Sequence, residues 1–485
     1  MIIRVRRSAA LRLSGGILLA LTGAAWGQAT DAFLNQQRAL EEQIARQLDR
    51  EMTVDQRTTF DFGGSYSFYT FLYDDGINSS RTLRRSDGRL WTRVGLDGGT
   101  HEGYARARMS YLDFNAGDAF EQDDNYLRRS LPGDDNDWEG PQLERGWYQF
   151  RLKNAMRAYG HQNVPYDLRM KIGRQYVEFG TGYALSLPLD AITLTGELAN
   201  FEVTGLMGNT IRSMNDIDRT RPGSHDTDRN FFGVQVRYLG LRQHKPFFYT
   251  VFNEDKHDES PERLLQNFDY DSHYIGFGST GSIISSDVRY GMEWVFEGGR
   301  SFGDRRFLHH DEIDAWGFDL LLEYFMPAPT KPHFLLEYMF ASGDPDRLGS
   351  PTDAIGGNRK DHDDTSFVGF GFRDTSLSFA PRLSNIHIWR AGASFFPFEK
   401  IEVIKEIELG TDWFLFTKHH DSGAVSDELA DLPAGYLGWE MDYFVNWRLT
   451  SDLSWTARYG AFFPGDAFSD QTSRYFFLTG LTWSF

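Results

Sequence analysis

The chain has 485 residues, of which 40% are apolar and 15% aromatic, and its net charge is −19. This acidity argues against nucleic acid as a partner, because phosphate binding needs a basic footprint. The chain has no cysteine, which excludes disulfides and thiolate metal sites, and its mean hydropathy of −0.47 is too polar for a bundle of membrane helices.

The N-terminus has the pattern of a secretory signal peptide. Arg4, Arg6, Arg7 and Arg12 precede an apolar run over residues 17–25. Small residues at positions 25 and 27 favour cleavage before Gln28, and cleavage after Ala29 is the other option. We therefore expect residues 1–27 to be removed, which changes the net charge to −23.

Residues 28–56 are expected to lie in the periplasm and to contain one amphipathic helix at 32–52. This stretch has no Gly or Pro, and Phe33, Leu40 and Ile44 recur at near-helical spacing. One interpretation is a solvated segment leading into the next domain, since an isolated helix of this length is marginal. The alternatives are a partner-binding helix that contacts a periplasmic export scaffold, or a segment that plugs the pore.

From Arg57 to Phe485 the apolar period changes to two, which is the period of a strand with two different faces. Between Leu437 and Arg448, for example, apolar and aromatic side chains alternate with mostly polar ones. A soluble sandwich produces the same alternation, so the number and spacing of the strands must decide.

Seventeen segments share this pattern, and a closed single-chain bacterial barrel prefers an even number of strands. Short and long connections alternate between them, as expected for periplasmic turns and external loops. We predict an all-β fold, a transmembrane antiparallel barrel of eighteen or sixteen strands over residues 57–485. The segments are 58–73, 89–97, 103–113, 146–153, 167–176, 199–208, 231–239, 246–253, 272–281, 286–297, 315–325, 333–341, 385–396, 401–417, 436–449, 453–463 and 474–485.

Four acidic or histidine-rich clusters, at 133–140, 309–314, 360–364 and 418–423, lie in expected loops. Calcium is the alternative for the first cluster, but none has a full EF-hand spacing, so we interpret all four as solvated loops. The histidine pairs are adjacent rather than four apart, unlike helix-borne zinc ligands. With no nucleophile elbow either, we expect no enzyme, no metal and no cofactor.

The polar face of the strands predicts the lining of the lumen, where fixed charges set the selectivity of a pore. The alternative for any single residue is that it pairs with another charge and braces the interior. The inward cations are Arg106, Arg108, Arg151, Lys153, Arg169, Lys171, Arg237, Arg289, Arg448 and Arg458, and the inward acids are Asp287, Glu293, Asp319, Glu323, Glu337, Glu440 and Asp442.

Two stretches resemble the bacterial alginate export family of outer-membrane proteins. The first, Lys171 to Gly208, carries Gly173-Arg174-Gln175, and the second, Gly435 to Phe468, carries Glu440 and Asp442. The last strand, which ends on Phe485, is similar to the C-terminal recognition signal of bacterial outer-membrane proteins. The resemblance implies an 18-stranded barrel with an arginine-lined constriction gated by loops, and it adds Arg174 to the expected substrate path.

These observations predict a monomer in the bacterial outer membrane, in contact with its lipid, that passively passes an anionic, alginate-like polysaccharide. The alternative is a substrate-selective porin for small anions or oligosaccharides. The acidity of the chain departs from the family pattern, and it makes an export barrel a firmer expectation than alginate as the substrate.

Overall fold

The computed structural model describes residues 58–76, 80–115, 136–158, 160–161, 164–211, 217, 227–256, 269–303, 310–347, 350–352 and 363–485. The expected signal peptide and periplasmic helix lie outside these residues. No helix in the described ranges is long and apolar enough to cross a membrane.

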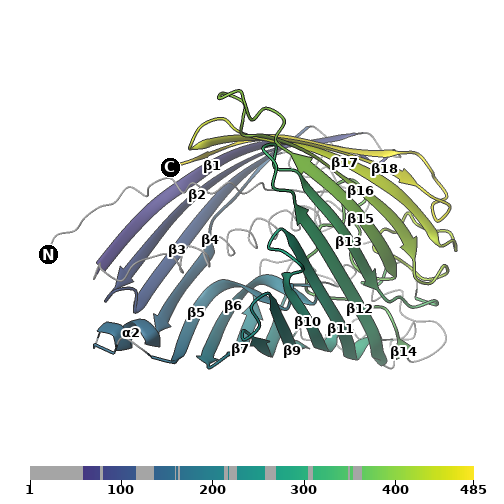
Figure 1. The fold of residues 1–485 in the computed structure, drawn as a ribbon. Helices are drawn as coiled ribbons and strands as arrows, with labels where there is room; N and C mark the ends of the chain where they lie inside the picture. Colours follow the sequence, from purple (N-terminus) through teal and green to yellow (C-terminus); the bar gives the residue numbers. More distant parts are fainter. Residues whose placement is uncertain are drawn as a thin grey trace.

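The described residues form one antiparallel barrel of eighteen strands, which confirms the predicted fold. Each strand pairs with the next, and β1 pairs with both β2 and β19, so the sheet has no open edge. Figure 1 shows the purple β1 beside the yellow C-terminal strands. A two-residue strand, β14 (Asp363–Asp364), only joins β12 in parallel.

The elements of the barrel wall, with one seven-residue helix after β4, are β1 (Thr58–Asp74), β2 (Arg81–Leu96), β3 (His101–Phe114), β4 (Asn136–Arg151), α2 (Leu152–Ala158), β5 (Tyr166–Phe179), β6 (Leu185–Leu198), β7 (Phe201–Thr210), β8 (Arg229–Tyr238), β9 (His244–Asp255), β10 (Asp271–Ser282), β11 (Val288–Gly303), β12 (His310–Phe325), β13 (His333–Ala341), β15 (Ile386–Phe395), β16 (Ile407–Lys418), β17 (Tyr436–Arg448), β18 (Leu453–Pro464) and β19 (Arg474–Ser484).

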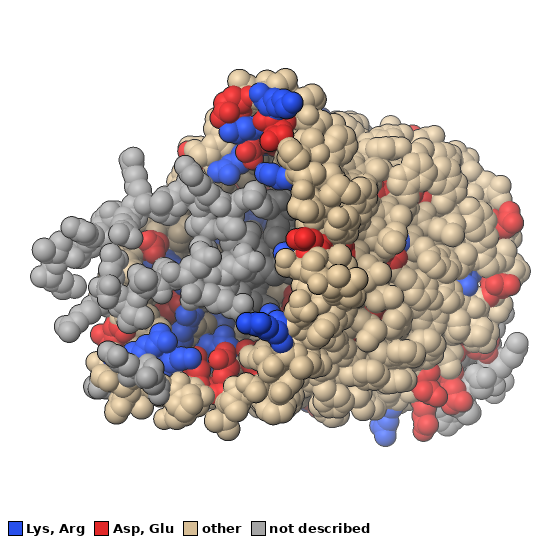
Figure 2. Space-filling view, in the orientation of Figure 1, with Lys and Arg blue, Asp and Glu red and all other residues tan. Residues whose placement is uncertain are grey.

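The outer face of the barrel is apolar and the inner face is polar. Leu90 and Leu336 point outward and are 64% and 59% exposed, whereas the inward Glu293 is fully buried. The broad right-hand surface in Figure 2 is mostly tan, with its charged side chains mainly near the edges. An apolar outer face on a closed barrel is what hydrocarbon requires, because lipid offers no partner to backbone polar groups.

The two ends of the barrel differ in the length of their connections. At one end the turns are short, such as residues 449–452 between β17 and β18. At the other end the connections are long, such as 342–385 between β13 and β15. By the rule for bacterial barrels, the short-turn end faces the periplasm and the long-loop end faces outward.

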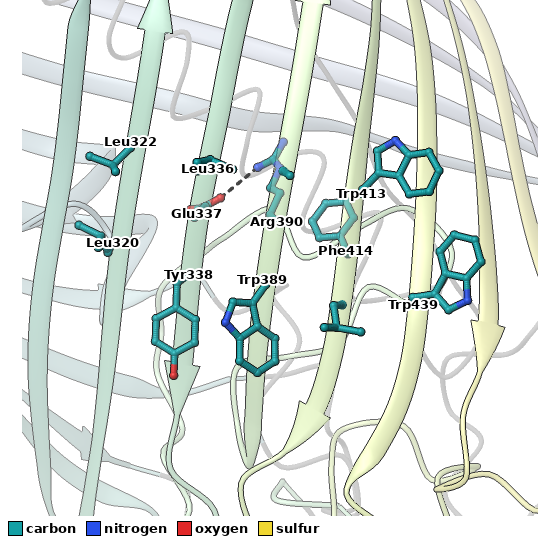
Figure 3. A pocket seen from close by; sticks show the side chains of 12 residues that line it. Leu320, Leu322, Leu336, Glu337, Tyr338, Trp389, Arg390, Trp413, Phe414 and Trp439 are labelled. Carbon is teal, nitrogen blue, oxygen red and sulfur yellow. Dashed lines mark hydrogen bonds and ion pairs between the residues drawn. The ribbon is translucent and has the colours of Figure 1, made fainter.

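A groove of about 490 Å³ runs over the outer face of β12 to β17. Trp389, Trp413 and Trp439 stand along it, while Glu337 and Arg390 form an ion pair at 3.2 Å (Figure 3). Aromatic side chains are typical of the interfacial parts of such barrels. The outer face of β12 to β17 is therefore suited to contact lipid.

The strand that the sequence did not reveal is β6. Its first five residues, Leu185–Leu189, are buried on both faces, so they show no alternation. They also include Pro188, which argues against a strand interior. Both features arise because this end of β6 leaves the lipid-facing wall and packs inside the barrel.

Candidate functional site

Two segments fold into the lumen from the long-loop end. The inner hairpin is the tip of β5 and β6, residues 176–187, and the inner loop is residues 365–385. They are joined by backbone hydrogen bonds: the Phe370 N–H donates to the Ala184 carbonyl at 2.8 Å, and the Ser186 N–H donates to the Phe370 carbonyl at 3.0 Å. The two segments therefore form a single body inside the barrel.

The inner hairpin is fastened to distant strands of the wall. The Gly180 N–H donates to the Gln235 side chain on β8 at 2.6 Å, and the Thr181 hydroxyl donates to Glu293 on β11. Tyr183 reaches further and donates its hydroxyl to the Phe340 carbonyl on β13. These contacts carry the hairpin across the interior and narrow the lumen.

Glu440 on β17 is the central anchor of the inner loop. Its carboxylate accepts the N–H groups of Leu377 at 3.0 Å and Phe379 at 2.8 Å, and also that of Ser378. The side chain of Asp442 accepts the Leu377 N–H as well, at 3.1 Å. A buried carboxylate needs such donors, because a charge without partners in an apolar interior is costly.

Two arginines continue this anchoring. Arg373 of the inner loop donates to Asp319 on β12 at 2.8 Å, and Arg390 on β15 contacts Asp374 of the inner loop at 2.9 Å. Burial alone would lower the pKa of Arg373, but the nearby carboxylates of Asp319 and Glu293 raise it above its usual value. Arg373 therefore stays charged and holds the loop against the wall.

The lumen side of β2 to β4 carries a set of arginines, which we call the arginine wall. Among its contacts, Arg106 pairs with Glu144 at 2.9 Å and Arg108 with Glu139 at 3.3 Å. Carboxylates paired with members of the set include Asp87, Glu102, Glu139 and Glu144. The wall consists of Arg85, Arg89 and Arg93 on β2, Arg106 and Arg108 on β3, and Arg145 and Arg151 on β4.

The predicted lumen cations lie in several places. Arg106, Arg108 and Arg151 belong to the arginine wall, next to Lys171 on β5. Arg169 and Arg237 share Glu202 near the short-turn end. The remaining three are Arg289 over the Phe325 ring on the far side of the barrel, Arg458 over the Phe444 ring, and Arg448 at the end of β17.

Two predicted positions differ from the expectation. Arg174 points to the outer face, where it makes a two-point ion pair with Asp190 at 2.8 and 2.9 Å. Lys153 lies in α2 rather than on a strand, and its N–H donates to Asp167. The alternation of β5 itself places Arg174 outside, with the exposed Leu168 and Ile172, so the first error came from the family resemblance and not from the strand pattern.

Asp319, Glu440 and Asp442 face inward as expected, but they are not open to the lumen. Their exposed fractions are 2%, 0% and 4%, because the inner loop covers them. We therefore assign them to hold the inner loop, not to line the substrate path.

Sequence reasoning missed four members of the arginine wall: Arg85, Arg89, Arg93 and Arg145. The stretch Arg81–Gly88 reads as a polar loop, yet it is the first half of β2. Leu83, Arg85, Asp87 and Arg89 alternate inward along it, so a search for period two in polar residues would have found the strand.

The lumen combines a basic wall with two inward-folded segments that narrow it, which is the arrangement of a pore. Within the described ranges, no group of three or more His, Asp or Glu residues is placed to hold a metal ion. In chemical terms, the arginine wall offers guanidinium groups that bind carboxylates at two points.

Comparison with known structures gives the same fold at low identity. The chain is similar to OccK5 (OpdH) of Pseudomonas aeruginosa (TM-score 0.53, 10% identity, 88% of this chain and 97% of that one). It is also similar to OpdK of Pseudomonas aeruginosa with vanillate (0.52, 11%, 87% and 98%) and to a BenF-like porin of Pseudomonas fluorescens Pf-5 (0.51, 11%, 88% and 98%).

Comparison with curated proteins finds no match. The family model for alginate export matches residues 149–477, well over half of the chain. The barrel architecture, the inward loops and this match agree with one another. The chain therefore belongs to the alginate export family and is a channel of the bacterial outer membrane.

Proposed function

We propose that the channel passively exports an anionic, alginate-like polysaccharide along the arginine wall. The observation that carries this proposal is the extension of the wall along the central part of β2, from Arg85 to Arg93. Arg85, Arg89 and Arg93 recur every four residues on the inner face of β2. Eight residues of strand span about 26 Å, so the arginines form a track and not a single site.

The track suits a polymer because its arginines share carboxylate partners with one another. Arg89 and Arg106 both pair with Glu144, and Arg93 and Arg151 both pair with Glu102. A carboxylate that lies between two arginines orients both of them. It also weakens their electrostatic attraction for a passing anion. Conduction needs such weak, repeated binding, since one tight site would stall the polymer.

A substrate-selective porin for small anions is the second candidate. The neighbouring OpdK structure contains vanillate, a small aromatic acid. The inner loop and the inner hairpin favour a small substrate, because they narrow the lumen. A polymer channel would use the whole length of the arginine wall, whereas a small-anion porin would use only one part of it. The two candidates therefore differ in how the channel responds to long substrates.

The test is the block of single-channel current in planar bilayers by alginate oligomers of increasing length. A polymer channel binds longer oligomers more tightly, because each added uronate contacts another arginine. A neutral glucose oligomer of equal length is the control. Block by alginate oligomers that strengthens with length supports export, whereas block that stops increasing after one or two sugars identifies a small-anion porin.

A further inference from the structure

An aromatic row lies on the inner face of the arginine wall, toward the short-turn end. Trp91 on β2, Tyr104 on β3 and Trp147 on β4 are neighbours across three strands. The ring centroids of Trp91 and Tyr104 are 6.3 Å apart and those of Tyr104 and Trp147 are 5.5 Å apart. In both pairs the ring planes are within 22° of each other, and all three side chains are half-buried.

Two glycines make room for the ends of this row. A Cβ at Gly63 on β1 would lie 2.9 Å from the indole of Trp91. At Gly173 on β5, φ is +124° and a Cβ would lie 2.9 Å from the Cα of Trp147. Because these two positions on β1 and β5 carry no side chain, both indoles can lie flat against the inner wall.

Cations surround the aromatic row on three sides. The Lys171 ammonium lies 4.3 Å from the centroid of the Trp147 ring. Arg106 is the direct cross-strand partner of Trp91, and Arg93 is that of Tyr104. The flat apolar faces of the aromatic rings therefore lie beside cations that can bind carboxylates.

We propose that this aromatic row is a stacking site for the sugar rings of an acidic polysaccharide. The inference rests on the proposed function and narrows its substrate to a polymer of uronate type. The C–H face of a pyranose carries partial positive charge and fits the negative face of an aromatic ring. Strands lie about 4.8 Å apart, so three adjacent rings offer steps comparable to one sugar unit.

The adjacent cations then select the acidic sugar. While a ring stacks on Tyr104 or Trp147, its carboxylate lies within reach of Arg93, Arg106 or Lys171. A neutral sugar makes only the stacking contact, and an anion without a ring makes only the ionic one. A uronate makes both, so it is retained longer than either.

The experiment compares three oligomers of equal length as blockers of single-channel current: an alginate oligomer, a glutamate oligomer and a glucose oligomer. In the unmodified channel we expect the alginate oligomer to bind most tightly. Replacing Trp147→Leu together with Trp91→Leu is expected to weaken alginate block about three- to ten-fold and to leave glutamate block unchanged.

Two variants show that the change is local. Trp147→Phe keeps a ring and is expected to keep most of the block. Tyr148→Leu removes the neighbouring, outward-facing ring of β4 and is expected to change nothing. An alginate block that survives the double replacement, or that weakens equally with glutamate block, overturns the stacking site while leaving the arginine track intact. If neither anion blocks the unmodified channel, the proposed function fails as well.

Discussion

The two sides of the lumen carry buried charge for different purposes. On β12 and β17 two inward carboxylates hold the inner loop: Glu440 binds three backbone N–H groups and Asp319 binds Arg373. On β2 to β4 the arginines share carboxylates with one another, as Arg89 and Arg106 share Glu144. Charge on one wall therefore holds the inner loop in place, and we propose that charge on the other acts on a substrate.

The comparison explains how an acidic protein can offer a basic path. Counting inward charges over the whole barrel mixes the two walls and hides the difference. What matters is what each charged group holds, which is a loop of the protein on one wall and, as we propose, a passing substrate on the other. The following predictions test this division, from the largest expected effect to the smallest.

Replacing Glu440→Ala is expected to have the largest effect, because it removes the acceptor of three neighbouring N–H groups in the inner loop. Each buried donor left without a partner costs about 1–3 kcal/mol. The inner loop should leave the wall and single-channel conductance should rise roughly two-fold or more. Glu440→Gln keeps one acceptor oxygen, so its single-channel conductance should rise less than that of Glu440→Ala. An unchanged conductance in Glu440→Ala would show that the loop does not set the constriction.

Replacing Asp319→Asn is expected to loosen the same loop to a smaller extent. Breaking a buried ion pair costs about 3–5 kcal/mol when the remaining charge has no partner. Arg373 keeps the nearby Glu293, so only part of this cost applies. We expect more frequent transitions between conductance levels in single-channel recordings, and a mean conductance below that of Glu440→Ala. Steady current at the unmodified level would argue against this anchor.

The smallest effect concerns external pH. His419 accepts the Gly343 N–H at 3.2 Å beside the start of the inner loop. Burial, followed by the neighbouring His420 and His387, lowers the pKa of His419 to about 4. The released loop then binds more protons than the docked loop between about pH 6.5 and pH 4, so docking weakens as the pH falls through this range.

Current fluctuations should therefore increase when external pH is lowered from 7 to 4.5. His419→Asn keeps an acceptor but does not titrate, so its fluctuations should change less over the same range. Equal pH responses in the two proteins would place the titrating group elsewhere.

The sequence revealed the parts of the barrel that contact lipid, because hydrocarbon forces an apolar side chain at every second position. It did not reveal β6, whose buried end has no lipid face. It also placed Glu440 and Asp442 correctly on the inner wall without showing what covers them. Inward folding of a loop depends on partners such as Glu440 and Leu377, which lie 63 residues apart and leave no local pattern.

The arginine wall was predicted only in part for a related reason. Arg106 and Arg108 alternate with small or apolar neighbours, so their strand was evident. Arg85 lies in a stretch so polar that it looked like a loop, although its inward positions follow the same period. Arg174 was misplaced because the family resemblance was followed there, although the alternation of β5 puts it on the outer face with Leu168 and Ile172.

The most direct test of the account is the zero-current potential of the channel under a potassium chloride gradient. We predict that the channel prefers chloride, that Arg89→Ala with Arg106→Ala moves the potential toward zero, and that Arg174→Ala on the outer face leaves it unchanged. A preference for potassium in the unmodified channel, or no shift in the double variant, would contradict the claim that the arginine wall is the substrate path.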